Sequence, residues 1–345
     1  MGPIFLAPPA RGWETLRRAR DVWHLHEVRA LVAAVCLILG APTPPAREVR
    51  VVMGTTAEIR LTGLAEPDAA LDAAFAALSR VDDAMSLWKP SELTRLNDAG
   101  GGRVSPDVLT VVAHALDVAA ASSGAFDPTV EPIVRATGGL GGPPRALGAA
   151  ERRRLLRRVG FRRVRLDLAR RELRLPRGTR LDLGGIAKGY AADLALAELR
   201  RAGARSGLVD LGGSSLGVFG ETLTVDVRDP EREDAAPWAS FRVEDAAVAS
   251  SGGDQRPGHI VDPRTGRAAG RILATTVVAR TGIEADALST AVYVLGADEG
   301  LRLLARRGAA GIVLLREHGE RVIRMTPGFA AAYSLIVAER VRARE

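Results

Sequence analysis

Residues Leu181–Asp193 read LDLGGIAKGYAAD, a stretch in which an acidic residue, two glycines and a lysine precede an alanine-rich run. Two short strand patterns between residues 160 and 183 lead into it, so the stretch predicts a turn from a strand into a helix ending near Arg201. Glycines let backbone amides approach a ligand, and a helix N-terminus attracts anions. The turn therefore suits a phosphate or pyrophosphate; an ordinary glycine turn with an exposed lysine is the alternative.

The stretch matches neither of two familiar phosphate-binding signatures. A Walker loop needs GxxxxGK[ST] and a dinucleotide fingerprint needs GxGxxG, and both patterns are absent from it. Lys188 is nevertheless unusual, because Lys89 is the only other lysine in a chain that otherwise uses arginine. A lysine ammonium is a compact point charge, so its use here hints at an electrostatic requirement that arginine does not meet.

Helix and strand patterns are mixed along the rest of the chain. REVRVVMGTTAEIRLTG alternates like a strand pair or one long strand, and helices are expected over residues 68–85, from Ser105 to Gly124 and across EADALSTAVYVLG. The stretch ATGGLGGPPRALG predicts a loop, and the last 35 residues suggest two strands and a terminal helix. Because helices and strands do not alternate strictly, the pattern predicts an α+β fold.

The composition describes a folded, basic chain. It has 345 residues, 47% of them hydrophobic and 26% charged, enough to bury a sizeable core. The net charge of +7 partly reflects a general preference for arginine. The segment ERRRLLRRVGFRRVRLDLARRELRL has no interleaved aromatic residue except Phe161. A solvated face is therefore favoured over nucleic-acid binding.

The N-terminal region differs from the rest of the chain. Residues 1–46 are predicted to form an export signal or membrane anchor with a linker, and residues 47–345 the catalytic region. The apolar run ALVAAVCLILGA is short for a bilayer span but suits a signal-peptide core, with arginines before it and PTPPA after it. The long leader leaves a buried helix as the alternative. We expect a periplasmic location or attachment to the outer face of the cell membrane, with the cytoplasm as the alternative.

Three further stretches carry chemically suitable side chains. Asp286 and Thr290 stand four residues apart on one helix face and are hard oxygen ligands that Mg²⁺ accepts, although such a pair can also be merely solvated. In GHIVDPRTG, His259 is a natural general base and Asp262 could orient it; a plain strand end is the alternative. GAFDPTVEP places Asp127 among an aromatic residue and two prolines, as in a pocket wall or a chain corner.

Taken together and in this order, these stretches resemble the FAD:protein FMN transferases, the ApbE-like flavin transferases. The resemblance covers about residues 48–326 and rests on MGTTAEI, MSLWKPSELTRLN, GAFDPTVEPIV, LDLGGIAKGYAAD, LVDLGG, SSGGDQRPGHIVDPRTGR and ADALSTAVYVLG. It implies mixed helices and sheets around a flavin-nucleotide cleft. It also implies Mg²⁺-dependent transfer of FMN from FAD to a threonine or serine hydroxyl of an acceptor flavoprotein, with release of AMP. A Mg²⁺-dependent FAD pyrophosphatase and a non-catalytic FAD-binding protein are the alternatives.

The resemblance also implies a role for individual residues. Contacts with FAD are expected from Met53, Trp88, Ala125, Phe126, Asp127, Asp182, Lys188 and Val261. The metal ligands would be Gly185, through its backbone carbonyl, together with Asp286 and Thr290. His259 would take the proton of the attacking hydroxyl and Asp262 would orient it. Ser214 is a departure, because the family usually has an aspartate at that position.

Overall fold

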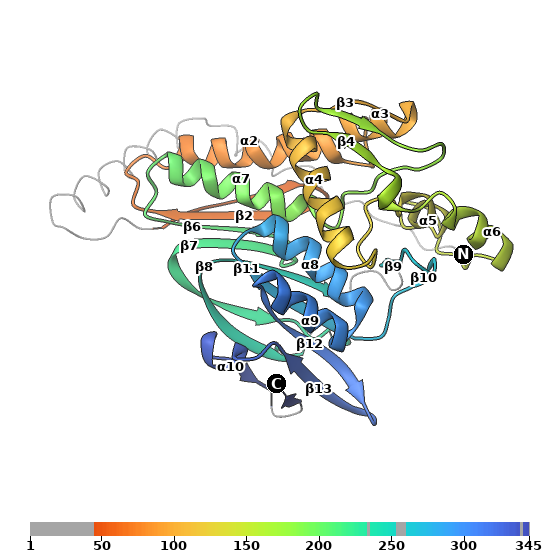
Figure 1. Ribbon diagram of the computed structural model, residues 1–345. Coiled ribbons are helices and arrows are strands. Elements are labelled where there is room, and N and C mark those ends of the chain that lie inside the picture. The colour runs from red at the N-terminus through yellow and green to blue at the C-terminus, as the bar shows by residue number, and fades with distance from the viewer. Residues whose placement is uncertain (1–44, 233–234, 253–259, 339–340, 345) are drawn as a thin grey trace, which may run out of the picture.

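The structure is a computed structural model that describes residues 45–232, 235–252, 260–338 and 341–344 (Figure 1). The N-terminal apolar run and the candidate base His259 lie outside these residues. In the part of the chain that is described, no helix combines the length and the apolar character needed to cross a membrane.

A large and mostly antiparallel sheet forms the centre of the fold. Its strands follow the order β1-β2-β6-β7-β8-β11-β12-β13-β15, with β14 pairing to β8 and only β13 and β15 running parallel. The strands are β1 Ala46–Val52, β2 Thr55–Thr62, β6 Ser206–Leu211, β7 Ser215–Val227, β8 Ala239–Gly252, β11 Ala274–Ala279, β12 Ala310–Glu317, β13 Glu320–Met325, β14 Ile336–Val337 and β15 Arg342–Arg344.

Helices cover one face of this sheet and form the main hydrophobic core with it (Figure 1). They are α2 Asp68–Met85, α4 Pro106–Ala121, α7 Ala187–Arg201, α8 Gly282–Leu295 and α9 Ala297–Arg307. A second core lies on the opposite face of the sheet, around Trp238 and Phe241. There the short helix α10 Phe329–Ala332 packs Phe329 against the ring of Phe241.

Smaller elements gather at one end of the molecule, beside α4 and α8 (Figure 1). They comprise a three-stranded sheet of order β3-β5-β4, a two-stranded hairpin and several short helices. The bounds are α3 Glu92–Ala99, β3 Gly101–Arg103, α5 Glu131–Ala136, α6 Ala149–Leu156, η2 Phe161–Arg163, β4 Arg165–Asp167, β5 Glu172–Arg174, β9 Val261–Asp262 and β10 Arg267–Ala268.

The predicted α+β class is confirmed, as are the helices over 68–85 and after the cap Ser105. The alternating stretch at the start is a strand pair, β1 and β2. The predicted terminal helix is wrong: α10 has four residues, and the chain then returns to pair with β8 and β13. The two short strands predicted between residues 160 and 183 are confirmed as β4 and β5. The chain directly before the glycine motif is not a strand, because its backbone groups at Leu181 and Asp182 bond to Asn97 and Pro128 and not to a neighbouring strand.

Candidate active site

The glycine turn, residues 182–188, is held by contacts on both sides. The Asp182 amide donates to the carbonyl of Pro128 at 2.7 Å, and the Asp182 Oδ1 atom accepts from the Gly184 amide at 2.8 Å. Gly185 lies against Thr290 and Phe126: a Cβ atom added to it would stand 3.1 Å from Thr290 Oγ1 and 3.4 Å from Phe126 Cε2. The turn therefore brings Gly185 and Thr290, two of the predicted metal ligands, together.

Helices α7 and α8 cross at two glycines immediately after this turn. A Cβ atom on Gly189 would stand 1.9 Å from the carbonyl oxygen of Gly282, so neither helix could approach as closely with a larger residue. Asp193, one turn along α7, accepts hydrogen bonds from the amides of Gly282 at 2.6 Å and Ile283 at 2.9 Å. It thus caps the N-terminus of α8 from a neighbouring helix.

This crossing places Asp286 of α8 beside Lys188 of α7. Asp286 is only 5% exposed, and its Oδ2 atom accepts from the Gly189 amide at 2.9 Å. Burial raises the pKa of Asp286, and the positive charge of Lys188 opposes that rise. Ser215 is also close to this carboxylate, and its buried hydroxyl has no well-aligned hydrogen-bond partner among the described residues. The site therefore holds a buried carboxylate beside a lysine.

Lys188 also contacts the residue that departs from the family pattern. Its Nζ atom donates to Ser214 Oγ, and the Ser214 hydroxyl in turn donates to the carbonyl of Leu211 at 3.0 Å. A hydroxyl leaves the lysine charge unneutralised, whereas a carboxylate at 214 would pair with it. The charge of Lys188 instead acts on Asp286, whose pKa it lowers against the effect of burial.

Met53 occupies the tight turn between β1 and β2. Its φ of 54° and that of Gly54, 71°, are both positive, as in a type I′ hairpin. A Cβ atom on Gly212 would stand 2.1 Å from Thr55 Oγ1, so this hairpin lies against the turn that leads to Ser214. Met53 thus belongs to a hairpin that contacts the turn leading to Ser214, and its conformation is uncommon for a methionine.

Ala125, Phe126 and Asp127, the predicted FAD-contacting tripeptide, are buried. The Asp127 carboxylate accepts from the amide and hydroxyl of Thr129 at 2.8 and 2.6 Å and from the Phe161 amide at 3.0 Å. Burial raises the pKa of Asp127. Its carboxylate therefore joins two loops of the protein, while the role of the tripeptide toward FAD stays a prediction.

The remaining predicted residues lie toward the hairpin end of the molecule. Val261 packs in a small core with Ile133 and Leu155. Both oxygens of Asp262 accept from Arg264, at distances of 2.9 to 3.1 Å, so its partner in the described structure is this arginine. Trp88 is 61% exposed. Its ring lies against Gly141 of the glycine-rich loop, where an added Cβ atom would stand 3.1 Å from Trp88 Cζ3.

The donor set at the helix crossing suits a metal that binds mainly water and substrate. Among the described residues, no group of three or more His, Cys, Asp or Glu side chains is arranged to hold a metal ion. Asp286 supplies one carboxylate, and the Thr290 hydroxyl lies beside Gly185. Mg²⁺ is commonly held by one or two carboxylates with waters and phosphate oxygens, so these residues fit it.

Two supporting residues could not be assigned from motifs. Asp193 closes the opening stretch, and its spacing of four from Gly189 would place it on the same helix face. Glu131 is fully buried and its Oε1 atom accepts from Arg135 at 2.6 Å and Arg180 at 3.1 Å. Burial and the negative charge of Glu131 both raise the pKa of Asp182. No sequence pattern marks a buried glutamate of this kind.

A family profile, related sequences and solved structures all match this chain to the same family. The sequence profile of the ApbE family matches residues 53–313. An FAD:protein FMN transferase of Treponema pallidum is 30% identical over 312 residues, covering 78% of this chain and 86% of that protein. A crystal structure of the ApbE protein from Thermotoga maritima superposes with a TM-score of 0.76 and 26% identity, covering 84% of this chain and 99% of the other.

A further relative is longer than this chain. The FAD:protein FMN transferase of Rhodobacter capsulatus is 30% identical over 300 residues, covering 82% of this chain. The match spans 57% of the Rhodobacter protein.

Proposed function

Because the chain belongs to the ApbE family, we propose that it transfers FMN from FAD to a threonine or serine hydroxyl of an acceptor flavoprotein and releases AMP. The observation that carries this proposal is the crossing of α7 and α8, where Lys188, Asp286, Thr290 and the glycine turn meet. A phosphoanhydride needs positive charge near it, and Lys188 offers that charge at this crossing.

Magnesium is the metal that we propose for this site. Asp286, the Thr290 hydroxyl and the Gly185 carbonyl would hold it, with phosphate oxygens and water completing its coordination. When bound, Mg²⁺ supplies Lewis-acid stabilisation of charge on the pyrophosphate. Lys188 supplies a further positive charge to the same group.

The proton of the attacking hydroxyl needs an acceptor. His259, which lies outside the described residues, remains our candidate for this base on the strength of its sequence motif. The orienting role of Asp262 stays a prediction; within the described residues its carboxylate accepts hydrogen bonds from Arg264. We therefore assign Asp262 and Arg264 a part in shaping the β9–β10 turn, where the Gly266 amide donates to the Asp262 carbonyl at 2.8 Å.

We also propose that the protein is exported and acts in the periplasm or on the outer face of the cell membrane. The support is the apolar run within residues 1–44, the arginines before it and the proline-rich stretch after it.

The deciding experiment is incubation with FAD, Mg²⁺ and candidate acceptor proteins, followed by a search for flavin fluorescence in a denaturing gel. A fluorescent acceptor band that requires both FAD and Mg²⁺ is the expected result. Release of free FMN and AMP without a fluorescent band, in the presence of an acceptor that a known flavin transferase modifies, would identify a pyrophosphatase. FAD binding without turnover would identify a carrier.

A further inference from the structure

The arginine-rich segment, residues 145–180, is a charged feature that the proposed chemistry does not use. It contains fourteen arginines and three acidic residues, a net charge of +11. The whole chain carries +7, so the residues outside this segment sum to −4. The excess positive charge of the protein is thus concentrated in one segment.

Most of these arginines are not neutralised within the protein. Four form ion pairs with carboxylates: Arg145, Arg170, Arg174 and Arg180. The other ten make no ion pair with any described residue: Arg152, Arg153, Arg154, Arg157, Arg158, Arg162, Arg163, Arg165, Arg171 and Arg177. Eight of the ten are exposed, Arg152 and Arg171 being half-buried. Guanidinium groups concentrated in this way repel one another, a cost that an acidic partner would offset.

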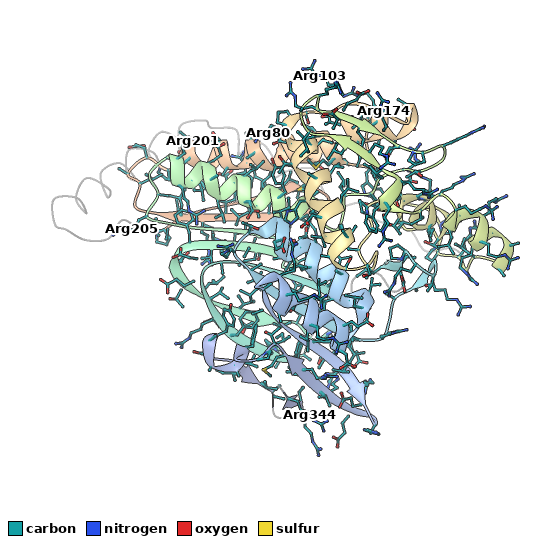
Figure 2. All side chains as sticks on the ribbon, in the orientation of Figure 1. Arg80, Arg103, Arg174, Arg201, Arg205 and Arg344 are labelled. Atoms are coloured by element: carbon teal, nitrogen blue, oxygen red, sulfur yellow. The ribbon has the colours of Figure 1, made fainter. Side chains whose placement is uncertain are left out.

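The arginine-rich segment borders the candidate active site. The Phe161 amide donates to Asp127, and a Cβ atom on Gly266, in the turn between β9 and β10, would stand 2.9 Å from Arg152 Cγ. The segment ends at Arg180, two residues before Asp182. Figure 1 shows α6 at the same end of the molecule as α5 and the β9–β10 hairpin, and Figure 2 shows Arg174 at the top of that side.

We propose that this segment is the docking surface for the acceptor protein, and that the acceptor is acidic around its modified serine or threonine. The inference rests on the proposed function, which requires a protein to bring a hydroxyl to this site. The surface around that hydroxyl must then meet the residues that border the site. Complementary charge at such a surface speeds encounter and selects partners without entering the chemistry.

Two other anionic partners fit the segment less well. Stable binding to a lipid surface usually combines an apolar face with the basic one, and Leu168 is the only large exposed apolar residue that the described structure shows in this segment. Binding to single-stranded nucleic acid uses aromatic side chains as stacking platforms, and the one aromatic residue here, Phe161, is 8% exposed. A protein surface rich in carboxylates needs only the exposed guanidinium groups.

The test compares two variants of the full-length protein that each remove four exposed arginines. The segment variant carries Arg153→Gln, Arg154→Gln, Arg157→Gln and Arg177→Gln. The matched control carries Arg232→Gln, Arg242→Gln, Arg302→Gln and Arg306→Gln, which are exposed positions outside the segment. Fluorescence anisotropy measures the binding of a labelled peptide of alternating Glu and Gly around one Thr, and of the same peptide with Gln for Glu. FAD titration measures the affinity of each protein for its nucleotide.

We expect the wild type to bind the Glu peptide at least about tenfold more tightly than the Gln peptide at low salt, with the difference shrinking as salt rises. The segment variant should lose most of that preference, while the control keeps it and all three proteins bind FAD equally. Equal binding of the two peptides, or equal losses in the two variants, would overturn the proposal. So would tighter, segment-dependent binding of phosphatidylglycerol vesicles or of an oligonucleotide. Failure of the proposed function looks different: FAD is bound but never transferred, whatever the peptide results.

Discussion

Asp286 combines two tasks in one buried side chain. One carboxylate oxygen accepts the hydrogen bond of the Gly189 amide, and the group is the only carboxylate among the proposed metal ligands. Substitution by alanine would remove both, so Asp286→Asn is the sharper variant because its amide oxygen can still accept from Gly189. We expect Asp286→Asn to lower Mg²⁺-dependent turnover by about a hundredfold or more, with the thermal midpoint nearly unchanged. Turnover assays at increasing Mg²⁺, beside thermal unfolding, measure the two effects.

Thr290→Val is the companion variant, since valine keeps the shape of threonine without its hydroxyl. Water can replace a hydroxyl ligand, so a smaller loss of turnover is expected than for Asp286→Asn. Equal losses in both variants would point to a general disturbance of α8, and full activity of Asp286→Asn in Mg²⁺ would remove the metal assignment.

His259 is the residue whose role separates a transferase from an FAD carrier. A threonine hydroxyl has too high a pKa to attack phosphorus unaided at neutral pH, so a positioned base contributes about 10²- to 10⁴-fold in rate. FAD binding needs no base. His259→Asn should therefore keep FAD affinity within a few-fold while single-turnover transfer falls by about a hundredfold. Parallel loss of affinity and transfer would make His259 a binding or structural residue, and loss of neither would assign the proton to another group.

At the scale of elements, the contact between α7 and α8 depends on the absence of side chains at Gly189 and Gly282. Alanine normally favours a helix over glycine by about 1 kcal/mol, but here its Cβ atom would stand 1.9 Å from a backbone oxygen that cannot rotate away. We expect Gly189→Ala to destabilise the fold by about 2 kcal/mol and to separate Lys188 from Asp286. Urea unfolding measures the loss of stability, and a turnover assay measures the effect of separating Lys188 from Asp286. Gly270→Ala is the control, because nothing lies within 4 Å of a Cβ atom there; similar effects in both variants would contradict the argument.

Glu284 ties α8 to α4 and α9. His114 Nε2 lies 2.5 Å from its carboxylate, and Arg307 donates to it at 2.8 and 3.1 Å. Burial alone would raise the pKa of Glu284, but the contacts with His114 and Arg307 outweigh burial and lower the pKa from 4.5 to about 2. A carboxylate with a depressed pKa stabilises the fold above its unfolded pKa and loses that contribution as the pH falls through its folded pKa.

Glu284→Gln should therefore lower the free energy of unfolding near neutral pH by about 2 kcal/mol, with the difference from wild type shrinking between pH 4.5 and about pH 2. Urea unfolding at several pH values measures it. Glu151→Gln is the control, since its pair with Arg145 is on the surface and should contribute little at any pH. A pH-independent loss in Glu284→Gln would mean that shape, not charge, is what the glutamate supplies.

At the scale of the molecule, the features that depend on neighbouring residues could be predicted from the sequence. The features that depend on contacts between residues far apart in the sequence could not. The α+β class, the helix capped by Ser105 and the glycine stop of α8 follow from periodicity and capping chemistry that reside in neighbouring residues. Asp193, Glu131 and Asp182 each have a partner tens of residues away, and only the assembled fold brings these pairs together. The terminal helix was mispredicted because its alanine-rich pattern was overridden by pairing with β8 and by aromatic packing on Phe241.

The cellular location of the whole molecule is also a prediction. The described hydrophobic clusters draw on residues from Ala46 onward. If the apolar run within residues 1–44 directs export, the full-length protein should fractionate outside the inner membrane or on its outer face. A variant beginning at residue 45 should stay in the cytoplasm and still bind FAD with unchanged affinity. Cell fractionation with a cytoplasmic marker enzyme and FAD titration measure the two properties. Full-length protein recovered from the cytoplasm would refute the export signal, and loss of FAD binding in the shortened variant would show instead that residues 1–44 belong to the fold.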